Sequence, residues 1–353
     1  MDALTIPGLL RLELGRGPSP DPTAEPAGFV VMSDDGHRIH FLDWGPARAI
    51  GAESAPGAES APRAGRAPEA AALPIAGPPG VLLIPGLAST AWSWAAVARR
   101  LTTSARVVAM DLRGHGLSDS PTEGYESDVL AADALAVADG AGLLPAASAP
   151  AAGPLVIVGI GYGAVVAAWA ARALGDRCAG LVLVDGGWED VAAVSEATPE
   201  EWLASIEEPP EVLASMKAWL ADRAAFDPST WDADEERAAR ARVVQTAAGR
   251  VKLAVHPHAM AGSVRALWSY EPAMVLPAVE APIVALIARD EDGSRAAALA
   301  EIAQLRAAAG GAPARAPIRV AAFPERGHNL ARHEPGPVAA AVLSAASAAT
   351  MRS

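Results

Sequence analysis

Cysteine, lysine and long apolar runs are all scarce in this sequence of 353 residues. The single cysteine, Cys178, excludes an internal disulfide, which fits a reducing compartment, so we expect a cytoplasmic protein. No apolar run approaches the ~18 residues that a membrane helix needs. The N-terminus has no charged segment followed by an apolar one, so we expect no signal peptide.

The charge is strongly unbalanced, at a net -13 with Lys217 and Lys252 as the only lysines. An excess of negative charge argues against nucleic acid or an anionic membrane as a partner. Hydrophobic residues make up 51% of the chain, which allows a sizeable core. The length allows one large α/β domain with an insertion, or two small domains.

Three stretches have little apolar patterning. Residues 1–27 are rich in proline, and we expect them to form a loose arm. Residues 46–79 consist mostly of Ala, Pro, Gly, Ser and Glu, and the hexapeptide at 51–56 is repeated at 57–62. Such a tract buries too little apolar surface to offset its ordering entropy, so it is predicted to be a disordered loop between two strands. A second loose stretch spans 145–153.

The rest of the chain alternates between short apolar runs and helical patterns. Strands are predicted at 28–32, 37–44, 81–85, 107–110, 155–160, 180–184, 282–288 and 318–323, and helices at 91–101, 127–139, after 161, at 294–309 and from about 335. The first two strands flank a tight-turn signal at 34–36 and form a β-hairpin. Strand and helix alternation predicts a mostly parallel sheet with helices on both faces.

From about 187 to 277 this alternation stops. The segment has no clear strand runs and carries five of the nine tryptophans on helical patterns. We therefore predict a single α/β domain over 28–350 with a helical cap inserted at 187–277.

The centre of the chain is the apolar run 155–160, which meets the turn Gly159-Ile-Gly161-Tyr-Gly163 and then a helix of small residues. A strand that turns sharply into a helix, with glycines where the backbone is crowded, has the shape of a G-x-S-x-G nucleophile elbow. The central position is Gly161, so the frame is present and the nucleophilic side chain is absent.

Five motifs in order give the chain a clear resemblance to the α/β-hydrolase superfamily, of the single-domain kind with a helical cap. They are Ile84-Pro85-Gly86 with Trp94 beyond it, Asp111 to Asp119, the elbow at 159–163, Leu181 to Asp185, and Gly327-His328-Asn329. The resemblance covers about 28–350 apart from the two low-complexity tracts. Two positions depart from the family pattern, because Pro85 replaces the usual His and Gly161 replaces the nucleophile.

The resemblance implies roles for several residues. His328 matches the catalytic histidine, a side chain suited to general-base work near neutral pH. The backbone N–H groups of Leu87 and Tyr162 would form the oxyanion hole. The acid partner of the histidine would come from the loop after 282–288, as Asp290 or Asp292, with Glu291 as a further candidate there. Some members of the family place it instead at the position of Asp185.

The ligand is less sharply indicated. Trp188 is the best candidate for a pocket wall, and an apolar or aromatic small molecule suits that composition. His256 and His258 lie two residues apart, but no third ligand is evident, so we expect no metal site and no cofactor. Nothing in the sequence indicates an oligomeric state.

Three interpretations of function remain open. The first is a pseudoenzyme that keeps its pocket to bind a small ligand or a partner. In the second, His328 and an acid activate water or abstract a substrate proton. The third is a hydrolase of carboxylic esters or related small molecules that has lost its serine recently. The missing nucleophile at Gly161 predicts weak or no activity as a serine hydrolase.

Overall fold

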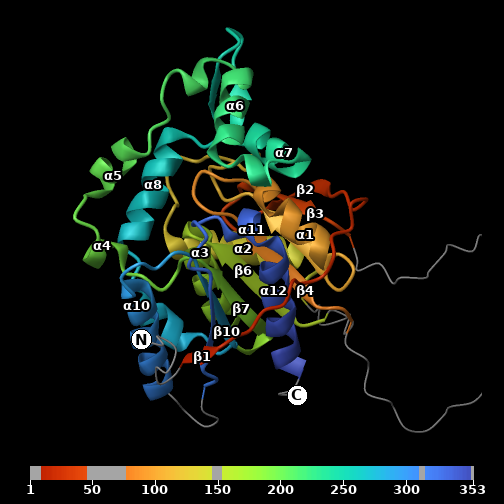
Figure 1. Ribbon diagram of the computed structural model, residues 1–353, viewed down its shortest axis with the longest axis vertical. Helices are drawn as coiled ribbons and strands as arrows, with labels where there is room; N and C mark the ends of the chain where they lie inside the picture. The colour runs from red at the N-terminus through yellow and green to blue at the C-terminus, as the bar shows by residue number, and fades with distance from the viewer. Residues whose placement is uncertain (1–8, 46–76, 145–152, 310–314, 351–353) are drawn as a thin grey trace, which may run out of the picture.

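The chain folds around a nine-stranded sheet, with a cap over one end of it (Figure 1). The computed structural model describes residues 9–45, 77–144, 153–309 and 315–350. The predicted disordered tract at 46–79 lies, apart from its last three residues, outside the described residues, as does nearly all of 145–153.

The strand order in the sheet is β1-β11-β10-β7-β6-β4-β5-β3-β2. The strands are β1 (Leu9–Arg11), β2 (Ala27–Met32), β3 (Arg38–Asp43), β4 (Gly80–Ile84), β5 (Arg106–Met110), β6 (Leu155–Ile160), β7 (Cys178–Val184), β10 (Ile283–Ile287) and β11 (Ile318–Ala322). Neighbours are parallel, except for the antiparallel pairs β2–β3 and β3–β5. The strands β4, β6, β7 and β10 are buried along their whole length, as expected where helices cover both faces.

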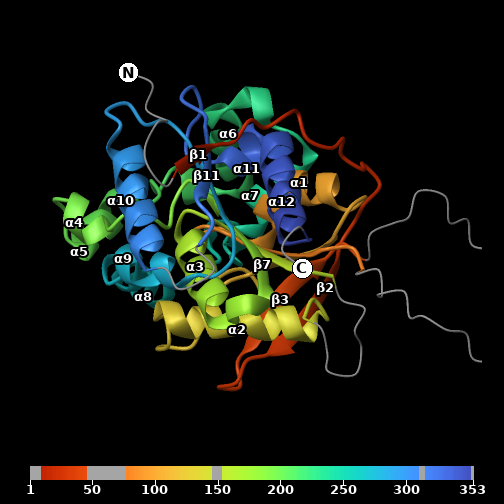
Figure 2. The same ribbon diagram turned by 90° about the horizontal axis from the view of Figure 1, so that it is seen from below.

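Helices cover the two faces of the sheet, and Figure 2 separates the two groups. One face packs on α2 (Ser127–Gly140), α3 (Tyr162–Leu174) and α10 (Ser294–Ala308). The other packs on η1 (Ala91–Trp94), α1 (Ala95–Leu101), α11 (Leu330–His333) and α12 (Pro335–Thr350). A short 3-10 turn, η2 (Gly175–Arg177), leads from α3 into β7. The predicted α/β-hydrolase fold, with its mostly parallel sheet between helical layers, is confirmed.

The cap follows β7 and stands at the top of the molecule in Figure 1. Its helices are α4 (Val191–Val194), α5 (Pro199–Ser205), η3 (Val212–Ala214), α6 (Met216–Phe226), η4 (Pro228–Thr230), α7 (Ala233–Ala241), α8 (Pro257–Trp268), α9 (Pro272–Val275) and η5 (Leu276–Ala278). The cap also contains a hairpin that the sequence did not indicate, in which β8 (Val243–Gln245) pairs with β9 (Val251–Leu253) in antiparallel fashion. Strands of three residues with polar side chains among them give no apolar run that a sequence reading could detect.

The proline-rich N-terminal segment is not wholly a loose arm. Its strand β1 pairs in parallel with β11 at the edge of the sheet. Further along, the buried Arg99 of α1 donates to the carbonyl of Ala24, and its Nη2 lies 2.7 Å from the carboxylate of Glu25. The same guanidinium pairs at 2.8 Å with Asp234 of the cap helix α7. One side chain therefore ties the N-terminal segment, the core and the cap together.

None of the helices in the described ranges combines the length and the apolar character that crossing a bilayer requires.

Candidate active site

The elbow lies where β6 meets α3. Gly161 has φ 54° and ψ -119°, a conformation that side-chain-bearing residues rarely adopt. Two residues on, a Cβ at Gly163 would lie 2.3 Å from the carbonyl oxygen of Pro85, so only glycine lets the helix approach the end of β4 this closely. The local sequence thus builds the strand–turn–helix geometry of a nucleophile elbow, with no side chain at its apex.

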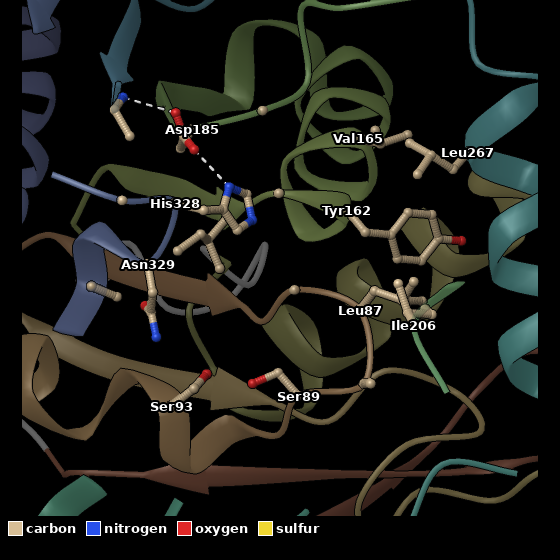
Figure 3. A pocket seen from close by; sticks show the side chains of 18 of the residues that line it. Leu87, Ser89, Ser93, Tyr162, Val165, Asp185, Ile206, Leu267, His328 and Asn329 are labelled. Carbon is tan, nitrogen blue, oxygen red and sulfur yellow. Dashed lines mark hydrogen bonds and ion pairs between the residues drawn. The ribbon is translucent and has the colours of Figure 1, made fainter. Parts of the chain in front are cut away.

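His328 stands beside this apex and is held by Asp185 (Figure 3). Its Nδ1 lies 2.6 Å from Oδ2 of Asp185, the residue directly after β7. The other ring nitrogen, Nε2, faces Gly161, at 2.9 Å from the point where a Cβ on that residue would be. The imidazole is two-thirds exposed and borders the pocket. The structure therefore brings together His328, Gly161 and one carboxylate.

Asp185 is buried and has three donors. Its Oδ1 accepts from the N–H of Ala288 at 2.8 Å and from Nη1 of Arg295 at 2.5 Å. Burial opposes ionisation, but the hydrogen bond to His328, the charge of Arg295 and the N–H of Ala288 outweigh it and lower the pKa of this carboxyl. An ionised carboxylate only accepts hydrogen bonds, so Nδ1 of His328 carries the proton and Nε2 is free to accept one.

The acid expected from the loop after β10 requires correction. Asp290 turns to the start of α10, where its carboxylate accepts from the N–H groups of Arg295 at 3.2 Å and Ala296 at 2.9 Å. Asp292 accepts from the N–H of Ser294. Glu291 is exposed and 3.8 Å from Arg289. These carboxylates accept from N–H groups at the start of α10 or face solvent. The partner of His328 is instead Asp185, the alternative that the sequence left open.

Asp185 adopts a left-handed conformation with φ 49°, which is uncommon for a residue with a side chain. Such backbone outliers cost about 1–3 kcal/mol and persist where surrounding contacts fix them. Here the contacts with Ala288, Arg295 and His328 fix the carboxylate.

The oxyanion hole that the family resemblance implies would use the backbone N–H groups of Leu87 and Tyr162. Leu87 belongs to the turn after β4, and Tyr162 is the first residue of α3; both line the pocket. Among the described residues, neither N–H donates a hydrogen bond. A pair of free N–H groups beside a histidine can hold an oxyanion, a carbonyl or a carboxylate. The next residue, Ala88, is left-handed at φ 55°, and its carbonyl accepts from Nε of the cap residue Arg242 at 2.9 Å.

The pocket between the elbow and the cap has a volume of about 1140 Å³. Apolar cap side chains contribute to its walls, among them Trp202, Ile206 and Phe226. The prediction that Trp188 forms a wall of the pocket is wrong, because this side chain is 1% exposed and packed in the core. Its neighbours Gly187 and Glu189 line the pocket instead.

Sequence reasoning also missed two of the arginines that line the pocket, Arg242 and Arg295. Arg295 could have been found only by its place in the first turn of a helix that starts near the carboxyl end of a strand. Nothing in the local sequence marks Arg242. Elsewhere in the described ranges, no cluster of three or more metal-ligating side chains could hold an ion. His258 is 3.0 Å from Oγ of Ser120, and its ring packs near that of His256.

Comparison with known proteins identifies the family to which this fold belongs. A family model described as the alpha/beta hydrolase family matches residues 81–341, and the chain belongs to that family. Mouse epoxide hydrolase 4 is 41% identical over 68 residues, which is 19% of each chain, so this protein spans about a fifth of that curated relative.

Solved structures agree along almost the whole chain. An E-2-(acetamidomethylene)succinate hydrolase is 20% identical, with 91% of this chain and 98% of that chain covered and a TM-score of 0.62. A thioesterase domain from the curacin biosynthetic pathway is 18% identical, with 90% and 99% covered and a TM-score of 0.64. A hydrolase from Pseudomonas aeruginosa is 21% identical, with 92% and 98% covered and a TM-score of 0.57. At these identities the likeness concerns the fold.

Proposed function

We propose that this protein is a small-molecule hydrolase that activates water directly and forms no acyl-enzyme. One observation carries the proposal: His328 has Nδ1 on the buried Asp185 and Nε2 directed at the empty apex of the elbow. A histidine held in this way is oriented as a general base. Glycine offers no atom that could attack a carbonyl, and in this proposal a water molecule held by His328 is the nucleophile.

The proposed reaction takes place on an ester or amide whose carbonyl oxygen accepts from the N–H groups of Leu87 and Tyr162. Water bound to Nε2 of His328 attacks the carbonyl carbon while Nε2 takes one of its protons. The two N–H groups stabilise the oxyanion of the tetrahedral intermediate. When the intermediate collapses, the leaving group departs with the proton from Nε2, and the histidine returns to its starting state.

Asp185 supports both proton transfers by holding the ring and stabilising the imidazolium that forms between them. Arg295 and the N–H of Ala288 keep that carboxylate ionised and in place. This arrangement favours catalysis over the two other interpretations. A pure binding protein has no use for an oriented base, and a serine hydrolase needs the side chain that Gly161 lacks.

The test is hydrolysis of a panel of 4-nitrophenyl esters by the wild type, His328→Gln and His258→Gln. General-base catalysis contributes about 10²–10⁴-fold, so His328→Gln should lose at least about 100-fold in kcat/KM. His258→Gln, a histidine outside the pocket, should retain wild-type rates. The wild type should form no adduct with a fluorophosphonate probe.

Two results would overturn the proposal. Wild-type hydrolysis that survives His328→Gln would remove the general base. Ligand binding in the pocket without turnover of any ester or amide would instead favour the non-catalytic binding protein.

A further inference from the structure

One cap residue places a positive charge in the pocket. Arg242 follows α7, lines the pocket and is partly buried. Its guanidinium lies 5.5 Å from the ring centroid of the fully buried Trp219, and its Nε donates to the carbonyl of Ala88. These two contacts fix the plane of the guanidinium. Among the described residues no hydrogen bond or ion pair uses Nη1 or Nη2.

The acidic residues that line the pocket have partners other than Arg242, and the pocket arginine Arg289 lies 3.8 Å from Glu291. The four acidic lining residues are each paired: Asp185 with His328 and Arg295, Glu189 with Arg295, Glu208 with Arg223, and Asp227 with His333. The carboxylates whose charge acts on Arg242 are those of Glu208 and Glu235. Glu208 is bound by both terminal nitrogens of Arg223, and Glu235 lies 3.3 Å from Nε of Arg332. Among the described residues, no carboxylate lies within ion-pair distance of Arg242.

An arginine stays charged in a protein, so a desolvated guanidinium without a counter-ion is costly. Burial first, and then repulsion by Arg223, lower the pKa of Arg242. The attraction of an anion bound in the pocket offsets both effects. A carboxylate matches the planar pair of donors at Nη1 and Nη2.

We propose that Arg242 binds a carboxylate of the substrate, so that the pocket takes esters or amides whose acyl part carries a second, anionic group. Its bond to Ala88 places the guanidinium beside Leu87, one of the two oxyanion donors, so the carboxylate lies near the reacting carbonyl. Trp202, Ile206 and Phe226 provide apolar surface for the remainder of the molecule. As a statement about substrates this rests on the proposed hydrolysis, whereas the anion site exists independently of it.

The first experiment measures binding without chemistry. Calorimetric titration with succinate and with its uncharged diamide, succinamide, is compared for the wild type, Arg242→Met and Arg240→Met. Arg240 lies two residues earlier in the last turn of α7, is exposed and pairs with Glu236, which makes it a matched control. Hydrogen bonds to charged groups are strong enough that Arg242→Met should weaken succinate binding about 10- to 100-fold.

Succinamide binding should be nearly the same in all three proteins, and Arg242→Lys should recover part of the succinate affinity. Equal succinate binding by the wild type and Arg242→Met would overturn the inference. Tighter binding of inorganic phosphate than of succinate would overturn the choice of a carboxylate.

The second experiment separates recognition from positioning. Mono-4-nitrophenyl succinate and 4-nitrophenyl acetate are compared as substrates. Arg242→Met should lower kcat/KM for the anionic ester about 10- to 100-fold more than it lowers kcat/KM for the neutral ester. Equal losses on both esters would show that Arg242 only holds the Ala88 turn, and the inference would fail.

The two proposals fail differently. Succinate binding that depends on Arg242 and persists in His328→Gln, without ester turnover by any variant, would support the anion site and defeat the hydrolase. Turnover that is lost in His328→Gln but unchanged in Arg242→Met would support the hydrolase and defeat the anion site.

Discussion

The ring of His328 occupies space that a side chain on Gly161 would need. A Cβ at residue 161 would lie 2.9 Å from Nε2 and 3.1 Å from Cε1, and a separation below 3.0 Å forces something to shift. A side chain at residue 161 would therefore require the end of the His328 imidazole to shift. The glycine and the inward position of the histidine form one arrangement.

Gly161→Ser and Gly161→Ala test this relationship. Both place a Cβ at φ 54° against the imidazole, so we expect each to lower the free energy of unfolding by about 1–3 kcal/mol in urea titrations. The histidine follows Gly327 on an exposed loop and can shift by a few tenths of an ångström. The serine variant should then react with a fluorophosphonate probe at residue 161, while the alanine variant should not. A folded serine variant that stays unlabelled would contradict this expectation.

Separate substitutions of Asp185 and Asp290 should distinguish an effect on kcat from an effect on stability. Asp185→Asn removes the charge that fixes the tautomer of His328, and should reduce kcat by about 10²–10⁴-fold. Asp290→Ala removes a carboxylate that accepts from two N–H groups of α10, and should cost about 0.5–1 kcal/mol of stability with unchanged kcat. Steady-state kinetics and urea denaturation report the two effects. A loss of kcat in Asp290→Ala alone would reverse the roles.

Glu235 predicts a pH-dependent stability. Burial raises its pKa to about 7, against the opposing charge of Arg332, while its ordinary value is 4.5. Between these values the folded chain keeps a proton that the unfolded chain has lost, so stability falls as pH rises from about 4.5 through 7. Glu235→Gln should stabilise the protein at pH 8, by no more than about 3 kcal/mol, and change little at pH 4.5.

The exposed Glu236 on the same helix provides the control for this measurement. Glu236→Gln should show the wild-type pH profile in urea titrations at pH 4.5 and 8. If Glu235→Gln and the wild type have the same dependence of stability on pH, the pKa of Glu235 is not raised by folding and the prediction is wrong.

Asp111 should matter for stability alone. Its buried carboxylate accepts from the N–H of Ala91 at 2.7 Å and of Leu117 at 3.0 Å, and contacts Nδ1 of His40 at 2.8 Å. Asp111→Ala leaves the buried N–H of Ala91 and the buried ring of His40 without this carboxylate, so we expect a loss of about 3–5 kcal/mol. Binding of succinate at a temperature where the variant remains folded should be unchanged. A weaker affinity would place this turn in the ligand site.

Motifs that act through the backbone could be predicted from the sequence. The apolar runs gave the buried strands, and the glycines around 161 gave the turn between β6 and α3. The position of His328 followed from the family pattern. These features depend on local sequence and on strand order, both of which a single chain displays.

The partner of His328 could not be chosen in the same way. Asp185 and Asp290 both follow strands whose carboxyl ends meet at the same edge of the sheet. Contacts with neighbouring groups determine which of the two pairs with His328. Asp290 accepts from N–H groups of the helix α10 that follows it, whereas Asp185 accepts from Ala288 and Arg295. Trp188 and Arg242 were misplaced or missed because the packing of a cap depends on contacts between distant segments.

The bare apex at Gly161 also sets the order of events in time. Hydrolysis through a side-chain ester is a ping-pong process, in which the leaving group departs before water arrives and another alcohol can intercept the stored acyl group. A glycine forms no covalent acyl intermediate, so substrate and water must be bound together at the moment of attack. Turnover should therefore show no initial burst of leaving group, and added methanol should compete only as a direct replacement for water.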